Sequence, residues 1–209
     1  MGRKVHIDAL REFARSTPAF RARDAEQLVG DRAYALLMLH QMARRGEIHR
    51  VTRGWYSSEG DPVVSVFAFS PAYLGLQEAL SVRGLWEQET NVVVVTPSKV
   101  EPGERQVMGG RVIVHRVKPA YFFGFDQVRH GSYSVPASDL EKTLIDLAYF
   151  GETPGADVLR RLVRVADLEK LRAYLGRYPP AFANAFWKKT RSPYQGWQHQ
   201  ASGAARQGG

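Results

Sequence analysis

Hydrophobic residues near the start of the chain recur at the three- and four-residue spacing of helices that bury one face. This spacing predicts a helix over residues 5–15, a second from about Asp24, and a third from an N-cap at Asp31 to Arg45. Gly30 and Gly46 follow the second and third helices, as is common where a helix ends. The second and third helices are therefore separated by a short turn.

The third predicted helix contains four consecutive large apolar residues, LLML, which a single face cannot bury together. The residues that fit one core-facing stripe are Ala35, Met38, Leu39 and Met42. Leu36 and Leu37 are left for a neighbouring domain, a second subunit or the methyl groups of thymine. The sequence does not choose among these three.

After the helices, two short extended runs lie on either side of Thr52-Arg53-Gly54 and predict a tight hairpin. Two helices joined by a turn and followed by a hairpin are typical of the winged helix-turn-helix. The second helix of that motif can enter the major groove of DNA. The sequence therefore predicts a DNA-binding domain over residues 1–60, with double-stranded DNA as the partner.

The residues expected to contact DNA are basic and hydrogen-bonding side chains of this domain. They are Arg23 in the second helix, Arg32 and Tyr34 near the start of the third, Gln41, Arg44 and Arg45 on its polar side, and Arg50 and Arg53 in the hairpin. Arginine can pair with guanine and glutamine with adenine, whereas the hairpin arginines are expected to contact phosphate or reach the minor groove. The alternative is that these are solvated charges on an amphipathic helix and at an ordinary hairpin tip.

Beyond residue 60 the pattern mixes strands and helices. Extended segments are predicted at residues 61–70, 91–96, 111–117, 122–125 and 132–135, with the Gly109-Gly110 turn joining the second and third of them. Helices are predicted at residues 71–82, from a Ser138/Glu141 capping box to Phe150, twice between residues 157 and 175, and after Pro179-Pro180 to about Lys189. The tail, residues 192–209, has no periodicity and is expected to be mobile.

The expected fold class is therefore α+β. A winged helix-turn-helix over residues 1–60 precedes a mixed α/β domain with a helical C-terminal end over residues 61–191. The chain has 209 residues and a formal net charge of +8, which favours polyanionic partners. The excess of basic residues lies at the two ends, since residues 61–150 hold 8 basic and 10 acidic side chains. We expect the ends to face nucleic acid.

Several chemistries are disfavoured by composition. The chain has no cysteine, its six histidines show no metal-binding spacing, and no apolar run is long enough to span a bilayer. The N-terminus lacks the apolar segment of a secretion signal. We therefore expect a soluble cytoplasmic protein that uses no metal and no cofactor and is not bound to a membrane.

A second basic surface is expected in the C-terminal helices. Its candidate residues are Arg160, Arg161, Arg164, Lys188, Lys189 and Arg191. One interpretation is a set of exposed helix faces. The other is a second polyanion surface for DNA that flanks the operator or for an RNA partner, and the sequence favours neither.

No catalytic site is expected, and the protein is predicted not to be an enzyme. Asp139, Glu141 and Lys142 only loosely resemble a metal-nuclease constellation, and the capping box explains Glu141 better. No phosphate-binding or nucleophile-elbow motif is present. The aromatic run at residues 121–125 is expected to pack in the core rather than to stack on bases.

The order of segments after the hairpin carries a family resemblance. YLGLQEALSVRGLWEQETNVVVVTPSK, VHRVKPAYFFGF and ASDLEKTLIDLAYFG together resemble the AbiEi antitoxin family of type IV toxin–antitoxin systems, over roughly residues 5–150. The resemblance implies an N-terminal winged helix joined to an antitoxin domain. It further implies a repressor of its own operon that counteracts a nucleotidyltransferase toxin without needing a stable complex with it. The operator is expected to be an inverted repeat near the protein's own promoter.

A second class of function remains open. In it the protein is a non-catalytic interaction protein whose winged helix makes protein or RNA contacts, or a degenerate nuclease-like enzyme. Binding to the protein's own upstream DNA separates these from a regulator.

Overall fold

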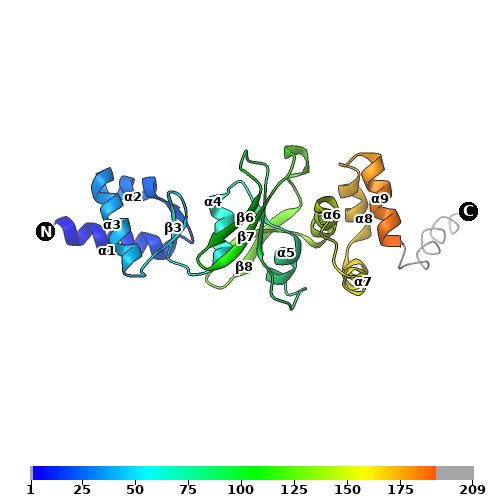
Figure 1. Ribbon diagram of the computed structural model, residues 1–209, viewed down its shortest axis with the longest axis horizontal. Coiled ribbons are helices and arrows are strands. Elements are labelled where there is room, and N and C mark those ends of the chain that lie inside the picture. The colour runs from blue at the N-terminus through cyan, green and yellow to red at the C-terminus, as the bar shows by residue number, and fades with distance from the viewer. Residues whose placement is uncertain (1, 192–209) are drawn as a thin grey trace, which may run out of the picture. The chain divides into compact units, whose positions relative to one another are not determined.

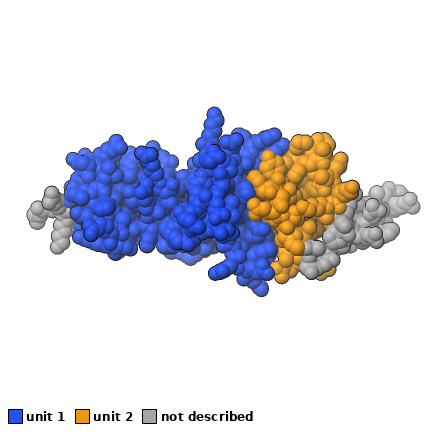
Figure 2. Space-filling model, in the orientation of Figure 1, with its two compact units in different colours: residues 1–138 blue, residues 139–209 orange. Residues whose placement is uncertain are grey.

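The chain is a mixed α+β protein that divides into two compact units, residues 1–138 and 139–209 (Figure 2). The computed structural model describes residues 2–191, except for the side chains of residues 2–5, 156, 157, 160 and 191. The tail expected to be mobile, residues 192–209, lies outside the described residues. The domain boundary expected at residues 60/61 falls inside the first unit and stays a prediction.

The first unit begins with three helices and a small three-stranded sheet (Figure 1). The elements are α1 (Gly2–Ser16), β1 (Phe20–Arg21), α2 (Ala22–Val29), α3 (Arg32–Arg44), β2 (His49–Thr52) and β3 (Trp55–Ser57). The strands are antiparallel, in the order β1-β3-β2. The three helices and the hairpin expected over residues 5–57 are therefore confirmed as elements.

Local signals in the sequence account for the ends of α2 and α3. Gly30 adopts a φ of 78°, which ends α2 in the left-handed region. The Asp31 carboxylate accepts a hydrogen bond of 2.8 Å from the backbone N–H of Tyr34 and so caps α3. Such a cap contributes about 1 kcal/mol. The apolar stripe expected on α3 is buried, and it packs in one cluster with residues of α1 and the hairpin. The stripe consists of Ala35, Met38, Leu39 and Met42.

The hairpin connects two hydrophobic clusters because adjacent residues of a strand point to opposite faces. On one face, Tyr56 stacks on Phe20 at a ring separation of 6.1 Å and joins the cluster of the three helices. On the other face, Val51 and Trp55 pack into the cluster that also contains Val107 and the segment after the hairpin. The hairpin is therefore held from both sides within the first unit.

The rest of the first unit is a six-stranded mixed sheet, in the order β6-β7-β5-β4-β9-β8, with short helices. The strands are β4 (Tyr73–Leu74), β5 (Val92–Thr96), β6 (Gly103–Val107), β7 (Gly110–Arg116), β8 (Phe125–His130) and β9 (Tyr133–Ser138). The helical segments are η1 (Pro62–Val64), α4 (Ser65–Ala68), α5 (Leu76–Val82) and η2 (Pro119–Tyr121). All five residues of β5 are buried, as its run of valines predicts.

The expectation of an extended segment over residues 61–70 is wrong. Asp61 accepts a hydrogen bond of 2.9 Å from the backbone N–H of Val63, and Pro62 occupies the first position of η1. Both are helix-starting features, and proline at that position is already set to a helical φ. These local signals prevail over the apolar run that suggested a strand.

The predicted strand connections also need correction. The Gly109-Gly110 turn joins β6 to β7, not β5 to β7, and β5 and β7 are parallel neighbours. Strand β6 was not among the predicted strands; it is an edge strand with one buried residue, Val107. The helix expected from Pro71 to Val82 is a short strand, β4, followed by α5.

The second unit is helical in the part that the structure describes. Its helices are α6 (Leu140–Phe150), α7 (Ala156–Val165), α8 (Leu168–Leu175) and α9 (Pro180–Arg191). Their positions agree with the predicted helices, including the break at Pro179-Pro180.

The capping box expected at the start of α6 is wrong. Asp139, not Ser138, caps α6 and accepts a hydrogen bond of 2.8 Å from a backbone N–H of its first turn. The Ser138 hydroxyl instead donates to the carbonyl of Leu74 at 3.4 Å. Glu141 accepts a hydrogen bond of 2.7 Å from the backbone N–H of Asp167, and so links α6 to the start of α8. An aspartate at the next position competes successfully for the cap.

Candidate nucleic-acid interface

Helix α3 presents one continuous exposed face on the side opposite its buried stripe. Its residues recur every three or four positions and are all exposed: Ala33, Leu37, His40 and Arg44. Leu37 lies in the middle of this face and keeps 49% of its surface accessible. Of these four residues, only Arg44 was predicted to contact DNA, and the partner of Leu37 was left open. Ala33 and His40 could have been found by helical spacing from Arg44.

At the start of α3, the two selected residues differ in environment. Arg32 is exposed in the first turn. Tyr34 is half-buried, and its ring lies edge-on to His6 of α1 at 6.4 Å between ring centres. Its packing on α1 gives Tyr34 a structural role in addition to any contact with DNA. Arg23 of α2 is exposed, with its guanidinium 3.9 Å from the Asp24 carboxylate.

At the other end of α3, Gln41, Arg44 and Arg45 are exposed. Arg45 differs from Arg44 because its guanidinium lies 3.7 Å from the Glu47 carboxylate. This ion pair partly neutralises the charge of Arg45. Arg44 is therefore the stronger of the two candidates for an anionic partner.

The hairpin places two arginines in solvent. Arg53 lies at the tip, followed by Gly54 at a φ of 75°, which the turn requires. Arg50 is exposed on β2 next to a register shift, and its Nε donates to the carbonyl of Thr52 at 3.4 Å. Next to the tip, the guanidinium of Arg21 on β1 lies 4.7 Å from the centre of the Trp55 ring. The tip thus carries positive charge on an anchored strand pair.

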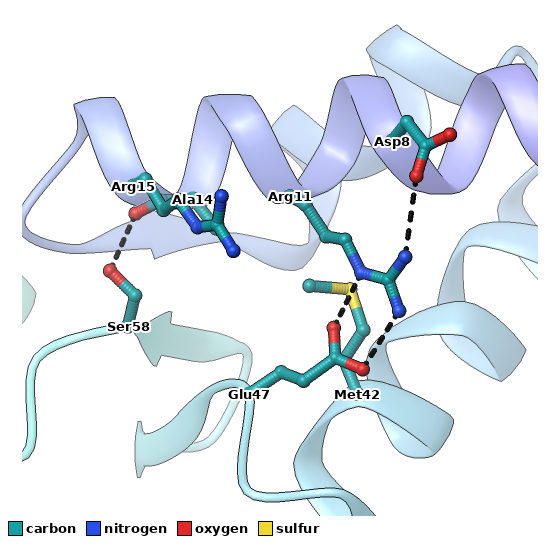
Figure 3. Close-up of a pocket in the computed structure, with 7 residues that line it drawn as sticks. All are labelled: Asp8, Arg11, Ala14, Arg15, Met42, Glu47 and Ser58. Atoms are coloured by element: carbon teal, nitrogen blue, oxygen red, sulfur yellow. Dashed lines mark hydrogen bonds and ion pairs between the residues drawn. The ribbon is translucent and has the colours of Figure 1, made fainter.

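A pocket of about 450 Å³ lies beside α1, and three of its charged side chains, Asp8, Arg11 and Glu47, are bonded to one another (Figure 3). Arg11 donates two hydrogen bonds to Glu47, at 2.7 and 2.9 Å, and a third to Asp8 at 3.3 Å (Figure 3). The hydrogen bond from Arg11 lowers the pKa of Glu47 below its ordinary value of 4.5. Ser58 donates to the carbonyl of Ala14 at 2.8 Å. The hydrogen bonds that line the pocket therefore hold α1 against the segment that follows α3.

The residues expected to form a second basic surface lie on α7 and α9 of the second unit. Arg161, Arg164, Lys188 and Lys189 are exposed, whereas the side chains of Arg160 and Arg191 lie outside the described residues. The Lys189 ammonium donates a hydrogen bond of 2.5 Å to the Thr153 hydroxyl. These positions fit both interpretations of the surface, so it stays a prediction.

The residues compared with a metal-nuclease constellation are engaged in contacts within the second unit. The Asp139 carboxylate, which caps α6, accepts a hydrogen bond of 2.9 Å from the Tyr174 hydroxyl. The Lys170 ammonium lies 3.1 Å from both Asp139 and Glu141, and Lys142 is fully buried. In the described part of the chain, no three His, Cys, Asp or Glu side chains are grouped to hold a metal ion.

The aromatic run around η2 and β8 packs largely as expected. Tyr121 is buried, and Phe122 stacks on the buried Tyr73 at 5.4 Å between ring centres. Phe125 also stacks on Tyr73, at 5.0 Å, yet keeps 37% of its surface exposed. The rings therefore form a packing cluster around Tyr73 of β4, and Phe125 is its most exposed member.

Comparison with known proteins gives a likeness in fold. The chain is similar to the crystal structure of the RV2827C protein from Mycobacterium tuberculosis, with a TM-score of 0.55 and 15% sequence identity. The alignment covers 88% of this chain and 75% of that chain. No protein-family model matches the sequence, and no curated protein sequence matches it. Among residues 2–191, no helix is long and apolar enough to cross a membrane.

Proposed function

We propose that the protein is a sequence-specific DNA-binding transcriptional regulator that represses its own promoter through an inverted repeat. In this proposal, residues 1–60 act as a winged helix-turn-helix, with α3 as the recognition helix and the β2–β3 hairpin as the wing. The observation that carries it is the exposed face of α3, which holds Leu37 and Arg44 beside Arg32 and Gln41. A mixed apolar and hydrogen-bonding face suits base edges in the major groove.

The hairpin supports the proposal through charge and anchoring. Arg53 has no ion-pair partner among the residues that the structure describes, so its charge is available to a phosphate. Tyr56 and Trp55 fix the strands behind it on two hydrophobic clusters. A phosphate contact from a fixed arm positions the recognition helix but carries no sequence information. The two elements therefore have separate tasks in the proposed complex.

We also propose that the protein acts as the antitoxin of a type IV toxin–antitoxin system whose toxin is a nucleotidyltransferase. This proposal rests on the resemblance of residues 5–150 to the AbiEi family. The corresponding segments of this chain lie in β4, α5 and β5, in the end of β7 and η2, and in α6. Most of them belong to the six-stranded sheet and its helices, which is the part of the chain proposed to neutralise the toxin.

The test uses the full chain and point variants. Cutting after residue 60 would separate Val51 and Trp55 from the sheet cluster in which they pack, so isolated halves are poor reagents. A double variant, R32A/R53A, and the wild type are expressed with a reporter under the protein's own promoter and, separately, with the cognate nucleotidyltransferase toxin of the proposed system. We expect the variant to lose repression but keep growth rescue. If the double variant keeps both repression and growth rescue, the DNA-binding role is rejected. If the wild type gives no growth rescue, the antitoxin role is rejected.

A further inference from the structure

A recess of about 350 Å³ lies between the hairpin and the edge strand β6 within the first unit. Its lining residues come from the hairpin, from the segment after α4 and from β6: Arg50, Val51, Thr52, Arg53, Phe69, Arg105, Gln106 and Val107. Three of these are arginines and none is acidic. Among the described residues, no carboxylate forms an ion pair with Arg50, Arg53 or Arg105.

The guanidinium of Arg105 is held in place by neutral groups. It donates to the carbonyls of Gly103 at 3.2 Å and Glu101 at 2.5 Å. Its Cζ also lies 5.3 Å from the centre of the Phe69 ring. None of these contacts neutralises its charge, and together they fix its position at the recess. A fixed, uncompensated guanidinium is well suited to a phosphate because its planar donors match phosphate oxygens.

The two sides of the recess are joined by buried apolar contacts. Val51 of β2 and Val107 of β6 belong to the same hydrophobic cluster, which Trp55 of β3 also contacts. Phe69, which Arg105 covers, is part of it too. The spacing between the hairpin arginines and Arg105 is therefore set by packing and does not depend on a flexible arm.

We propose that this recess binds a phosphate of the DNA backbone beside the wing, held by Arg105 together with Arg50 and Arg53. Strand β6 then belongs to the DNA interface, which extends beyond residues 1–60. The inference rests on the proposed DNA-binding function and adds a second contact region to it. It also assigns a role to an edge strand whose polar side chains have no place in the core.

The test measures DNA binding by full-length R105A across a salt series. Loss of one phosphate contact should reduce the slope of log K against log salt by about 0.9, which is about an eightfold weaker affinity at 0.1 M salt. The loss should be the same on promoter and scrambled duplexes, because phosphate contacts carry no sequence information. Thermal unfolding of each variant confirms that it is folded.

The matched control is R111A on the neighbouring strand β7. Arg111 is exposed and already pairs with Glu104 at 2.9 Å, so its removal should leave affinity and slope unchanged. R105Q repeats the test with a polar side chain, in case R105A fails to fold. If the folded Arg105 and Arg111 variants have the same DNA affinity and salt slope while R53A still binds more weakly than wild type, this inference is overturned. The proposed DNA-binding function would still stand. Absence of DNA binding by the wild type overturns it together with the proposed function.

Discussion

At the scale of single residues, the proposed interface separates side chains that position DNA from those that read it. Arg53 lies at the wing tip, where a phosphate contact is expected, and R53A should weaken binding to all sequences and flatten the salt slope by about 1. Arg32 lies in the first turn of α3, and R32A should cost about 1–3 kcal/mol on the preferred site only. Fluorescence anisotropy on promoter and scrambled duplexes measures both. Identical, sequence-independent losses would show that the two arginines do not divide the work.

Also at this scale, the ion pair between Lys142 and Asp146 has a desolvation cost that offsets much of its attraction, because both charges are buried. Both side chains are fully buried one turn apart on α6, and burial lowers the pKa of Lys142 while Asp146 opposes that effect. Lys142 also donates to the Tyr178 hydroxyl at 3.2 Å. K142M should destabilise the protein by about 3–5 kcal/mol, because it leaves a buried carboxylate without its cation.

The control for that prediction is the double variant K142M/D146L. It replaces both charges by apolar groups and should recover most of the lost stability, since a buried ion pair is often no better than a packed apolar pair. Urea unfolding of the three proteins measures the difference. A double variant less stable than K142M would contradict this account.

At the scale of elements, the hydrogen bonds between Arg11 and Glu47 hold α1 to the segment that follows α3. The hydrogen bonds from Arg11 lower the pKa of Glu47 from its ordinary value of 4.5. A carboxylate whose pKa is lower in the folded state stabilises the fold above its unfolded pKa, and loses that effect as pH falls through the folded value. R11M should therefore lower the melting temperature by a few degrees at pH 7, and the gap from wild type should narrow below about pH 4.5. If the difference in melting temperature between R11M and wild type stays constant with pH, the loss of stability comes from packing and not from the ion pair with Glu47.

The exposed face of α3 yields a prediction about what it reads. Leu37 lies centrally on that face, between Ala33 and Arg44, and is the large apolar residue there. In the proposed complex it contacts a thymine methyl group, so replacing every thymine of a half-site by uracil should cost wild type about 1 kcal/mol. The same replacement should cost L37A much less. Equal losses in the two proteins would assign Leu37 to another partner.

Elements with strong local signals could be predicted from the sequence, and those defined by tertiary contacts could not. Asp31 and Gly30 mark the ends of α3 and α2, and the valines of β5 mark a buried strand. Strand β6 shows no alternation, because its residues before Val107 are polar or glycine and lie at a sheet edge. The start of α6 was misassigned because Ser138 and Asp139 are both good caps, and only the folded chain shows that Ser138 bonds to Leu74.

At the scale of the whole molecule, the candidate interface was predictable only within residues 1–60. Helical spacing and the basic hairpin identify Arg32, Arg44 and Arg53 without a structure. Arg105 carries no such signal, because its place beside the hairpin depends on Val51 and Val107 sharing a cluster across more than fifty residues of sequence. The first unit thus joins the proposed wing to the six-stranded sheet, which holds most of the segments that are proposed to neutralise the toxin.

The most direct test of the central claim is the ratio of dissociation constants of the full-length protein for its own promoter and for a scrambled duplex. Measured by fluorescence anisotropy at physiological salt, the promoter should bind at least about a thousandfold more tightly, with random DNA in the micromolar range or weaker. Equal affinity for the two duplexes would contradict sequence-specific recognition by α3, and with it the proposed regulator.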